Sequence, residues 1–353
     1  MIKELSQLIS QIKPVDPAWL AQARERLDSL TKPPGSLGRL EEIAARYVAI
    51  RGELFPPLAR KQIVVFAADH GVVAEGVSAF PQEVTRQMVY NFLQGGAGIN
   101  VLARHVGAAV EVVDIGVNHV FGEQPGLISQ KVAYGSRNMA REPALTREEA
   151  VQSMLVGVER AQAAIAAGAD ALAAGDMGIG NTTPAAALAV VFTGKPASVV
   201  TGRGTGIGDN TWRHKVGVIN RSLEIHKPTA DHPLEALAKV GGLDIGGIAG
   251  LILGAAAGQR PVLLDGFIAT AGALVAAHLA PAVTDYLIAA HCSVESGHQL
   301  MLDTLGLKPL LNLQLRLGEG TGAALGLGML DAALKIYKEM ATFDEAGVAE
   351  KHS

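Results

Sequence analysis

The stretch QIVVFAADHG, residues 62–71, joins an apolar run of strand length to a short polar turn. A run that is apolar at successive positions is typical of a strand with both faces covered, as in a parallel sheet between helices. Comparable runs, each followed by a polar or glycine turn, occur at residues 110–116, 169–175, 261–266 and 284–291. We therefore expect these segments to be strands of one mainly parallel sheet.

Helical patterns separate several of these expected strands. Thr146-Arg147-Glu148-Glu149 forms a capping box, which predicts a helix from there to about residue 167. Further helices are expected near residues 84–94, 183–192, 211–226, 245–257 and 267–279. Alternating strands and helices favour an α/β fold built on an open, mainly parallel, Rossmann-like sheet that is flanked by helices.

The two ends of the chain carry helical patterns without strands between them. Asp16-Pro17 predicts a helix start, with Asp as the N-cap and Pro at the first helical position. Ser36 is expected to cap the next helix, and a last helix is expected near residues 322–341. We predict that these ends form a smaller helical domain beside an α/β substrate-binding domain, with the boundaries 1–58, 59–321 and 322–353.

The composition excludes several classes of partner. A net charge of −4 and an aromatic content of 4% give no basis for binding nucleic acid or an anionic membrane. The most apolar stretches, 245–258 and 266–277, are shorter than the ~20 residues of a membrane span, and no signal peptide is visible. The single cysteine, Cys292, precludes an internal disulfide and is typical of a reducing cytoplasm. We expect a cytoplasmic protein that binds small molecules, with no nucleic acid and no membrane as partner.

Two similar glycine loops precede expected helices, GDMGIGNTTP at 175–184 and GRGTGIGDNT at 202–211. Backbone N–H groups at a helix start favour an anion, and Thr or Asn side chains add hydrogen bonds, so phosphate is the expected ligand. Neither loop is a Walker A motif, because no Gly-Lys-Ser/Thr follows. The alternative is a pair of structural helix caps. Lys215 follows the second loop and is either a charge partner for a phosphate or carboxylate, or a solvated helix lysine.

The stretch LRLGEGTGAALG, residues 315–326, places a carboxylate, Glu319, between two glycines. Alternating leucines precede it and a small-residue helical pattern follows, which indicates a strand or extended segment, a tight turn and a helix. Flanking glycines let a substrate approach the backbone closely, so that the carboxylate can point into a cleft. The alternative is a glycine turn with a solvated glutamate.

A third segment combines aromatic, thioether and amide side chains. Gln87 with Phe80, Met88 and Tyr90, in and before an expected helix, could line a pocket for a flat aromatic ligand. The alternative is an amphipathic helix whose apolar face packs in the core.

Residue types that bind metals follow two of the expected strands. Asp69-His70 and the segment HCSVESGH at 291–298 offer His, Asp, Glu and Cys, which are zinc ligands. Their spacing matches neither CxxC pairs nor HExxH, so we expect no metal site. We expect instead a hydrogen-bonded rim of a nucleotide pocket, with Ser293 near a phosphate or ribose. A Ser-His-Asp triad is possible in composition, but no GxSxG elbow accompanies it.

Five stretches taken together are similar to the motifs of one known family, namely KPPGSLGRLE (32–41), FAADHGV (66–72), GDMGIGNTTPAAAL (175–188), GRGTG (202–206) and LRLGEGTGAALG (315–326). They span nearly the whole chain and resemble the nicotinate-nucleotide:dimethylbenzimidazole phosphoribosyltransferase family of cobalamin synthesis. The resemblance implies a homodimeric α/β enzyme with a parallel sheet and a small helical domain built from the chain ends. It implies phosphoribosyl transfer from nicotinate mononucleotide to 5,6-dimethylbenzimidazole, giving α-ribazole 5′-phosphate and nicotinate, without a cofactor.

Matching these motifs residue by residue gives the site that the resemblance implies. Glu319 matches the family's catalytic carboxylate, and position 176 carries Asp where some members have Glu. The positions that match nucleotide or phosphate contacts are Asp176, Gly178, Gly180, Asn181, Thr182, Thr183, Gly202, Arg203, Gly204, Thr205, Gly206, Lys215, Ser293, Gly318, Gly320 and Thr321. The segment that contacts the benzimidazole contains Ser78, Gln87 and Met88.

The implied reaction needs a carboxylate. When one benzimidazole nitrogen attacks C1′ of the ribose, the other N–H becomes acidic, and Glu319 within hydrogen-bond reach can remove its proton. The pyridinium leaving group departs as a neutral ring without a general acid, and no metal is needed for this step. Displacement from the opposite face would convert a β-nucleotide into an α-product.

Two other functions remain as alternatives. One is a metal-dependent hydrolase that uses Asp69, His70, His291 and His298. The other is a non-catalytic protein that binds nicotinate mononucleotide without releasing nicotinate. The glycine loops fit the enzyme and the binding protein equally well, whereas Glu319 within GEGTG favours the enzyme.

Overall fold

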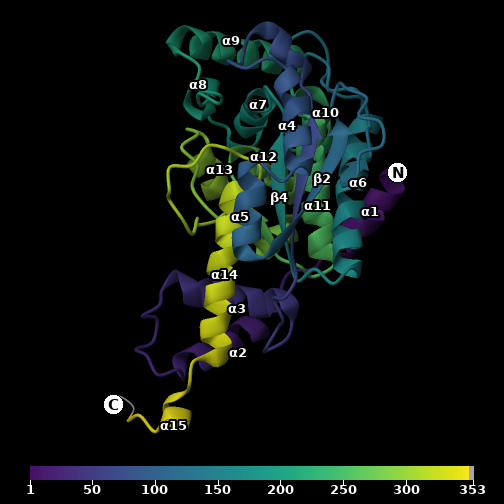
Figure 1. The fold of residues 1–353 in the computed structure, drawn as a ribbon. Coiled ribbons are helices and arrows are strands. Elements are labelled where there is room, and N and C mark those ends of the chain that lie inside the picture. Colours follow the sequence, from purple (N-terminus) through teal and green to yellow (C-terminus); the bar gives the residue numbers. More distant parts are fainter. Residues whose placement is uncertain (350–353) are drawn as a thin grey trace.

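The sheet is open and has six strands, all parallel, in the order β3-β2-β1-β4-β5-β6. The computed structural model describes residues 1–349 of the chain (Figure 1). The strands are β1 (Lys61–Ala68), β2 (Ala108–Gly116), β3 (Leu127–Ser129), β4 (Ala171–Met177), β5 (Val262–Leu264) and β6 (Leu287–Ala289). The predicted open, parallel α/β fold is confirmed, and the strand order is that of a doubly wound Rossmann-like sheet.

The expected strands are all present, although β5 and β6 are shorter than the apolar runs that contain them. The sequence did not predict β3, because three residues are too few to form a recognisable pattern. The leucine segment before the GEGTG turn belongs to no strand, and Gln314 within it has a φ of +56°. Leu311 forms an isolated bridge with His291, and the carbonyl oxygen of Leu315 accepts from the N–H of Val294 at 3.2 Å. This segment therefore runs along the loop that follows β6.

Helices cover both faces of the sheet. The residues of β1 alternate between two cores, so that Val64 and Phe66 pack on one face while Ile63 and Val65 pack on the other. This burial on both sides explains the unbroken apolar run. One face is covered by α6 (Arg147–Ala166), α11 (Leu243–Ala257) and α12 (Phe267–Leu279), and the other by α4 (Glu83–Leu93), α5 (Gly98–Val106) and α14 (Thr321–Glu339). Further helices are α7 (Thr182–Thr193), α8 (Ala197–Val200), α9 (Asp209–His226), α10 (Pro233–Val240) and α13 (His298–Thr304).

The glycine-rich helix α11 lies deep in the core because its glycines allow α6 to approach closely. A Cβ atom on Gly250 would lie 1.8 Å from the carbonyl oxygen of Met154, and one on Gly157 would lie 1.9 Å from that of Gly247. Larger residues at these positions would force the two helices apart, since protein interiors are close-packed. None of the helices within residues 1–349 combines the length and the hydropathy that a membrane crossing requires.

Helices from both ends of the chain form the lower lobe in Figure 1. They are α2 (Pro17–Asp28), α3 (Arg39–Arg51), the second half of α14, and α15 (Phe343–Ala346). The predicted start of α2 is confirmed, since the Asp16 carboxylate accepts from the N–H of Ala18 at 2.9 Å. Ser36 is not the cap of α3, because Gly38 occupies that position with a φ of 52°. The domain boundaries at residues 58 and 322 stay a prediction.

Helix α1 (Ile2–Gln11) lies apart from this lobe. It packs against α6 and α11, and Leu5 joins the core on that face of the sheet. Our grouping of α1 with the other N-terminal helices is therefore wrong, because its apolar side is buried against the α/β part of the molecule.

The strand order brings polar residues together at one edge of the sheet. Ligand crevices form in such sheets where the strand order reverses, here between β1 and β4, at the carboxyl ends of the strands. Asp69, Asp176, Asp265 and His291 end or follow β1, β4, β5 and β6 at this edge. The carboxyl edge is therefore where a site for small molecules is expected.

Candidate active site

A cavity of about 400 Å³ opens at the carboxyl ends of the strands. Its walls come from the loops after β4, β5 and β6, from the segment that leads into α4, and from the turn before α14. The residues assigned from the sequence that line it are Ser78, Met88, Asp176, Gly178, Gly180, Asn181, Thr182, Gly204, Thr205, Ser293, Gly318 and Glu319. The assigned residues that do not line it are Gln87, Thr183, Gly202, Arg203, Gly206, Lys215, Gly320 and Thr321.

Glu319 occupies a turn with an unusual backbone. Its φ is +64°, and its neighbours Gly318 and Gly320 have φ values of +84° and +92°. A residue with a side chain adopts this left-handed conformation only where its surroundings enforce it, at a cost of about 1–3 kcal/mol. Behind the turn, a Cβ on Gly175 of β4 would lie 2.3 Å from the carbonyl oxygen of Glu319, so the turn packs directly on the strand end. Glu319 is 5% exposed, so the alternative of a solvated glutamate is wrong.

The carboxylate of Glu319 is held at the start of α5. Its Oε2 accepts a hydrogen bond from the N–H of Ile99 at 3.1 Å. Burial raises the pKa of Glu319, the Ile99 N–H opposes that change, and the nearby Asp265 charge adds to it, so the pKa lies above its ordinary value. A carboxylate with a raised pKa is a better proton acceptor than an exposed glutamate.

Asp176 lies beside this turn at the end of β4. Burial raises the pKa of Asp176 well above its usual value, and the charges of Asp265, Asp244 and Glu319 raise it further. Its Oδ2 accepts from the Asn181 side-chain amide at 2.9 Å. Two carboxyl groups with raised pKa values therefore share the cavity wall, which is typical of sites that handle protons.

The first glycine loop closes tightly over β1. A Cβ on Gly178 would lie 2.4 Å from the carbonyl oxygen of Ala68, and Gly180 has a φ of +91°. The loop leads into α7, and Thr182 at the start of this helix lines the cavity. Thr183 lies behind the cavity wall and is completely buried. This loop therefore presents a helix start to the cavity, as an anion site requires.

Lys215 is a buried cation beneath both glycine loops. It is 1% exposed, so the alternative of a solvated lysine is wrong. Its Nζ donates to the hydroxyl oxygen of Thr182 at 2.6 Å, and it lies 3.3 Å from where a Cβ of Gly204 would be. Burial lowers the pKa of Lys215 to about 8, against the opposing effect of Glu295. Lys215 therefore acts on the cavity through Thr182 and does not line it.

The second glycine loop is held by Glu295, which the sequence offered only as a possible zinc ligand within the segment 291–298. Glu295 Oε1 accepts from the N–H of Gly204 at 2.9 Å, and a Cβ on Gly202 would lie 1.8 Å from Glu295 Oε2. Arg316 donates to the carbonyl oxygen of Gly204 at 3.3 Å. Arg203 points away and pairs with Asp209. Gly202 is therefore required by the close approach of Glu295, and only Gly204 and Thr205 face the cavity.

Part of the cavity wall beside the glycine loops is apolar. Phe80, Val84, Met88 and Met177 contribute to it, and Ser78 Oγ lies 3.4 Å from Thr205 Oγ1. This wall fits a flat aromatic ring. Gln87 does not contribute, because it lies on the exposed side of α4 while the next residue, Met88, turns inward. The expected contact of Gln87 with a bound base therefore has no support from the cavity lining and stays a prediction. Tyr90 is also absent from the cavity wall and packs on His119 and Phe121 instead.

The histidines near the cavity each have a separate partner. His70 Nε2 lies 3.2 Å from Asp244 Oδ2, and His291 Nε2 lies 3.5 Å from Asp265 Oδ1. Burial disfavours the charged form of His70, but Asp244 and Asp69 outweigh it and raise its pKa. No group of three or more potential metal ligands comes together within residues 1–349. The hydrolase alternative therefore lacks the ligand cluster on which it depended.

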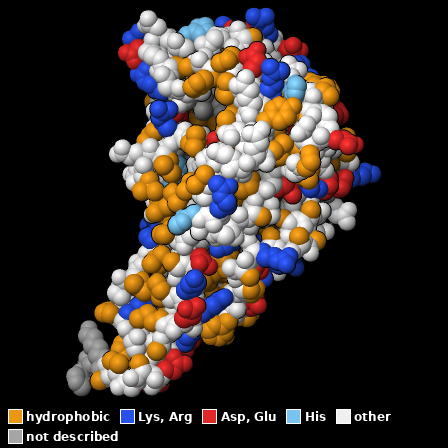
Figure 2. Space-filling view, viewed as in Figure 1, with side chains coloured by type: hydrophobic (Ala, Val, Ile, Leu, Met, Phe, Trp, Pro, Cys, Tyr) orange, Lys and Arg blue, Asp and Glu red, His pale blue; other side chains and the backbone are white. Residues whose placement is uncertain are grey.

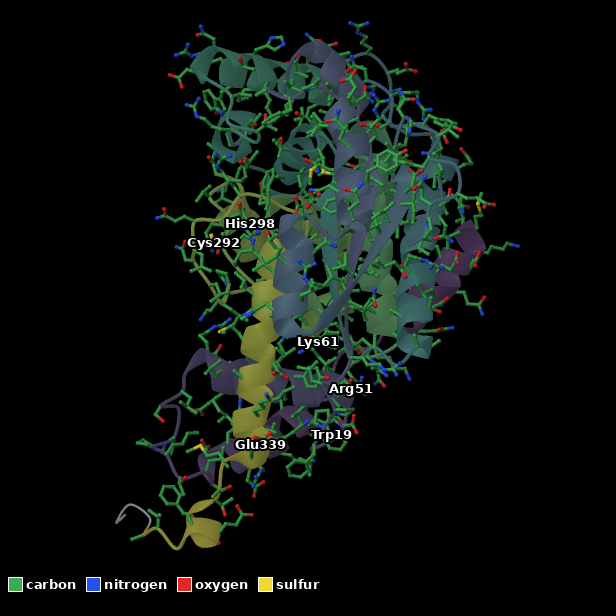
Figure 3. The ribbon with its side chains drawn as sticks, viewed as in Figure 1. Trp19, Arg51, Lys61, Cys292, His298 and Glu339 are labelled. Carbon is green, nitrogen blue, oxygen red and sulfur yellow. The ribbon has the colours of Figure 1, made fainter. Side chains whose placement is uncertain are left out.

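His298 orders the loop that carries Ser293. Its Nδ1 accepts from the N–H of Ser293 at 2.8 Å, and its Nε2 lies 2.9 Å from the hydroxyl oxygen of Thr270. Burial, and then the nearby His291, lower the pKa of His298 to about 3, so the ring is neutral near pH 7. Figure 3 places His298 and Cys292 together in the upper body, far from Trp19 in the lower lobe.

Comparisons with known proteins identify the family of the chain. A family model described as phosphoribosyltransferase matches residues 12–348. The chain is 61% identical over 346 residues to the nicotinate-nucleotide–dimethylbenzimidazole phosphoribosyltransferase of Geobacter sulfurreducens and 56% identical over 347 residues to that of Chloroflexus aggregans, with 98% of each chain covered in both cases. The crystal structure of CobT from Thermus thermophilus superposes with a TM-score of 0.91 at 52% identity, covering 95% of this chain and 100% of that one. The chain therefore belongs to the nicotinate-nucleotide–dimethylbenzimidazole phosphoribosyltransferase family.

Proposed function

We propose that this protein transfers the 5-phosphoribosyl group from nicotinate mononucleotide to 5,6-dimethylbenzimidazole, and releases α-ribazole 5′-phosphate and nicotinate. The product would supply the lower ligand of cobalamin. The observation that carries this proposal is the buried carboxylate of Glu319, with its raised pKa, in a cavity that is also lined by the start of α7 and by apolar side chains. The printed names of the curated relatives contain the same two substrates.

The nucleotide is expected to bind on the side of the glycine loops. Its phosphate fits the start of α7, where Thr182 presents a hydroxyl that Lys215 polarises, with Ser293 and Gly204 on the neighbouring walls. A phosphate there would lie near the buried ammonium charge of Lys215 behind Thr182, which favours the anion because burial weakens solvent screening. The phosphate is a binding handle in this scheme and does not react.

The base is expected to lie against the apolar wall near Met88 and Met177, with one ring N–H directed at Glu319. Its other nitrogen attacks C1′ of the ribose, so the new N–C1′ bond forms as the bond to the nicotinate nitrogen breaks. The electron pair of the broken bond returns to the pyridinium ring, which leaves neutral, and the benzimidazole proton goes to Glu319. Holding both rings in line supplies much of the rate, since correct orientation alone can contribute several kcal/mol.

A chromatographic assay tests the function directly. Purified protein is incubated with nicotinate mononucleotide, with and without dimethylbenzimidazole, and nicotinate and the new nucleotide are quantified. Release of nicotinate that depends on the base, with matching nucleotide formation, is the expected result. Release without the base would indicate a glycosidase, and binding without any release would indicate the non-catalytic alternative.

Assembly and location are finer parts of the proposal. A homodimer is supported by large apolar side chains exposed in the segment before the Glu319 turn, where Leu313 and Leu317 are 52% and 62% exposed. Figure 2 shows hydrophobic side chains gathered on this flank of the molecule. Light scattering at assay concentration, with a Leu317→Glu variant as comparison, tests the dimer. A cytoplasmic location is supported by the single cysteine, Cys292, and is tested by cell fractionation.

A further inference from the structure

The turn that carries Glu319 needs an external support. Gly318, Glu319 and Gly320 are three successive residues in the left-handed region, and Glu319 has a side chain that disfavours this conformation. The conformational preference of Glu319 therefore disfavours the turn that it occupies. Such a conformation persists only where the surrounding structure over-determines it.

Asp265 supplies this support from the end of β5. Its Oδ2 accepts from the N–H of Gly320 at 3.1 Å, and its Oδ1 accepts from the N–H groups of Gly322 and Ala323 at 2.7 and 3.1 Å. These donors begin at the residue after Glu319 and continue into the first turn of α14. They lack partners within the helix, and a carboxylate is favourable at a helix N-terminus. One side chain thus fixes the position at which the turn becomes a helix.

The surroundings leave Asp265 no freedom to move. It is 1% exposed, and His291 Nε2 lies 3.5 Å from its Oδ1. The ring of His291 packs so closely on α14 that a Cβ on Gly322 would lie 1.9 Å from its Cδ2. The distance between the end of β5 and the Glu319 turn is therefore set by rigid elements on both sides.

We propose that Asp265 is a positioning residue, which holds the Glu319 carboxylate where it can remove the proton of the incoming base. Asp265 does not line the cavity, so it acts through Glu319 and not on the substrates. Ile99 holds the far end of the Glu319 side chain, and Asp265 holds its backbone. This inference rests on the proposed function and adds a residue that no sequence motif marked.

The pKa of Glu319 can distinguish a positioning role of Asp265 from a role as a helix cap alone. The titratable groups near Glu319 are Asp265 and Asp176. His291 lies beside Asp265, and Asp244 lies near Asp176. The negative charge of Asp265 contributes to the raised pKa of Glu319. Removing that charge should move the ionisation of Glu319 to lower pH, which loss of a helix cap alone would not do.

The experiment compares Asp265→Asn with a matched control, Asp114→Asn. Asp114 is also a buried carboxylate at the end of a strand of the same sheet, and its Oδ1 accepts from the N–H of Val117 at 2.9 Å. It is paired with Lys131 and does not line the cavity. The Glu319 carboxyl carbon is followed by NMR in protein labelled at glutamate, and its signal is identified by its loss in Glu319→Gln. Kinetics and nicotinate mononucleotide binding are measured on the same samples.

In Asp265→Asn we expect the Glu319 ionisation and the acid limb of kcat to move to lower pH. We expect kcat to fall by about 10- to 100-fold while the affinity for nicotinate mononucleotide stays within about threefold, since a small displacement of a reacting group costs that much. Asp114→Asn should leave the Glu319 ionisation and kcat unchanged. Asp265→Glu keeps the charge but displaces the turn, so it should lower kcat without moving the acid limb.

Specific results would overturn the proposal. A folded Asp265→Asn protein with wild-type kcat and an unshifted Glu319 signal would do so. Equal losses of kcat and nucleotide affinity in both Asp265 variants would reduce the residue to a structural cap. If Asp265→Asn does not fold, the Asp265→Glu variant tests the proposal instead. Its kcat must then fall while it still binds nicotinate mononucleotide. The NMR titration needs no substrate, so a wild-type protein without turnover would count against the proposed function while the titration still tests Asp265.

Discussion

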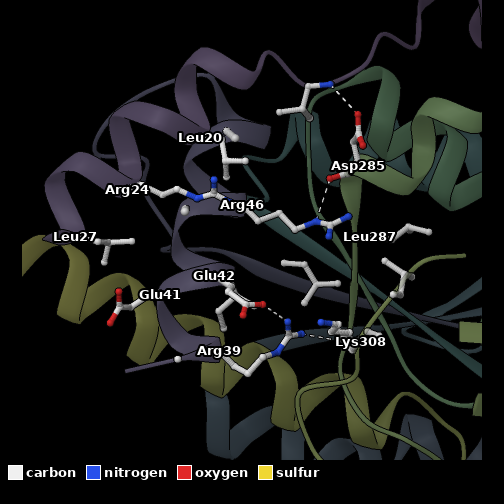
Figure 4. Close-up of a pocket in the computed structure, with 18 of the residues that line it drawn as sticks. Leu20, Arg24, Leu27, Arg39, Glu41, Glu42, Arg46, Asp285, Leu287 and Lys308 are labelled. Atoms are coloured by element: carbon white, nitrogen blue, oxygen red, sulfur yellow. Dashed lines mark hydrogen bonds and ion pairs between the residues drawn. The ribbon is translucent and has the colours of Figure 1, made fainter. Parts of the chain in front are cut away.

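The two main concave regions described for this protein differ in the charge of their walls more than in their volumes. The groove between α2, α3 and the end of β6 has a volume of about 690 Å³, whereas the cavity at the strand ends has about 400 Å³ (Figure 4). In the groove, opposite charges meet, since Arg39 pairs with Glu42 and donates to the carbonyl oxygen of Lys308. Arg46 likewise donates to the carbonyl oxygen of Asp285. Four basic and four acidic side chains line this groove, namely Arg24, Arg39, Arg46 and Lys308 with Asp28, Glu41, Glu42 and Asp285, so its charges are balanced.

The smaller cavity has the opposite character. Asp176 and Glu319 place two carboxyl groups on one wall, and burial raises the pKa values of both. Glu319 also sits in a strained turn. Neighbouring buried carboxyl groups and backbone strain both cost stability, and proteins retain them chiefly where function depends on them. Charge balance and strain thus identify the site here better than size does.

The largest expected effect tests the cavity. Glu319→Gln keeps the shape of the side chain but removes the proton acceptor, so kcat should fall by about 10²- to 10⁴-fold. Nucleotide affinity and the melting temperature should stay near wild type in calorimetry and thermal unfolding. Glu42→Gln on the groove wall is the matched control and should retain full turnover. A Glu319→Gln protein with turnover within about tenfold of wild type would remove Glu319 from its assigned role.

The next effect concerns the buried cation. Lys215→Met should lower kcat/KM for nicotinate mononucleotide by about 10- to 100-fold, because a charged hydrogen-bond partner of the phosphate site is lost. Since the pKa of Lys215 is about 8, wild-type kcat/KM should decline as pH rises through about 8, and this decline should vanish in Lys215→Met. Lys195→Met, on the exposed surface, is the control. An unchanged alkaline limb in Lys215→Met would show that another group causes it.

A smaller effect follows from the pKa of Glu319. This pKa is raised above 4.5, and Glu319 accepts a proton only when ionised, so kcat/KM should fall as pH decreases through the raised pKa. The acid limb should therefore lie above the range of an ordinary glutamate in a pH–rate profile. The limb should persist in Asp176→Asn, because the reacting base is still present. If Asp176→Asn removes the limb, the proton acceptor is Asp176.

The smallest effect is expected in the groove. Arg24→Ala changes an exposed side chain on the groove wall and should alter the free energy of unfolding by less than about 0.5 kcal/mol. Its kcat/KM should remain within about twofold of wild type, because the groove does not take part in the proposed reaction. A tenfold loss measured by the same assay would make the groove part of the functional site and would break the comparison.

Local patterns were sufficient for much of the fold and the site. The apolar runs predicted the main strands because burial on both faces leaves no polar position in the sequence. The capping box at Thr146 and Glu149 formed as expected, since it depends only on neighbouring residues. The GEGTG turn pointed to Glu319 for the same reason, because left-handed glycines beside a carboxylate can be read from a few residues.

Tertiary structure decided the rest. Gln87 and Met88 are adjacent in sequence, yet only Met88 lines the cavity, because the packing of α4 selects the face. Lys215 became a buried cation through the loops folded over it. Asp265 and Ile99 reach the Glu319 turn from 55 and 220 residues away. Sequence alone determined the sheet, the glycine loops and the candidate carboxylate. Only the fold determined its pKa and position, because burial, charge and backbone support come from residues distant in the chain.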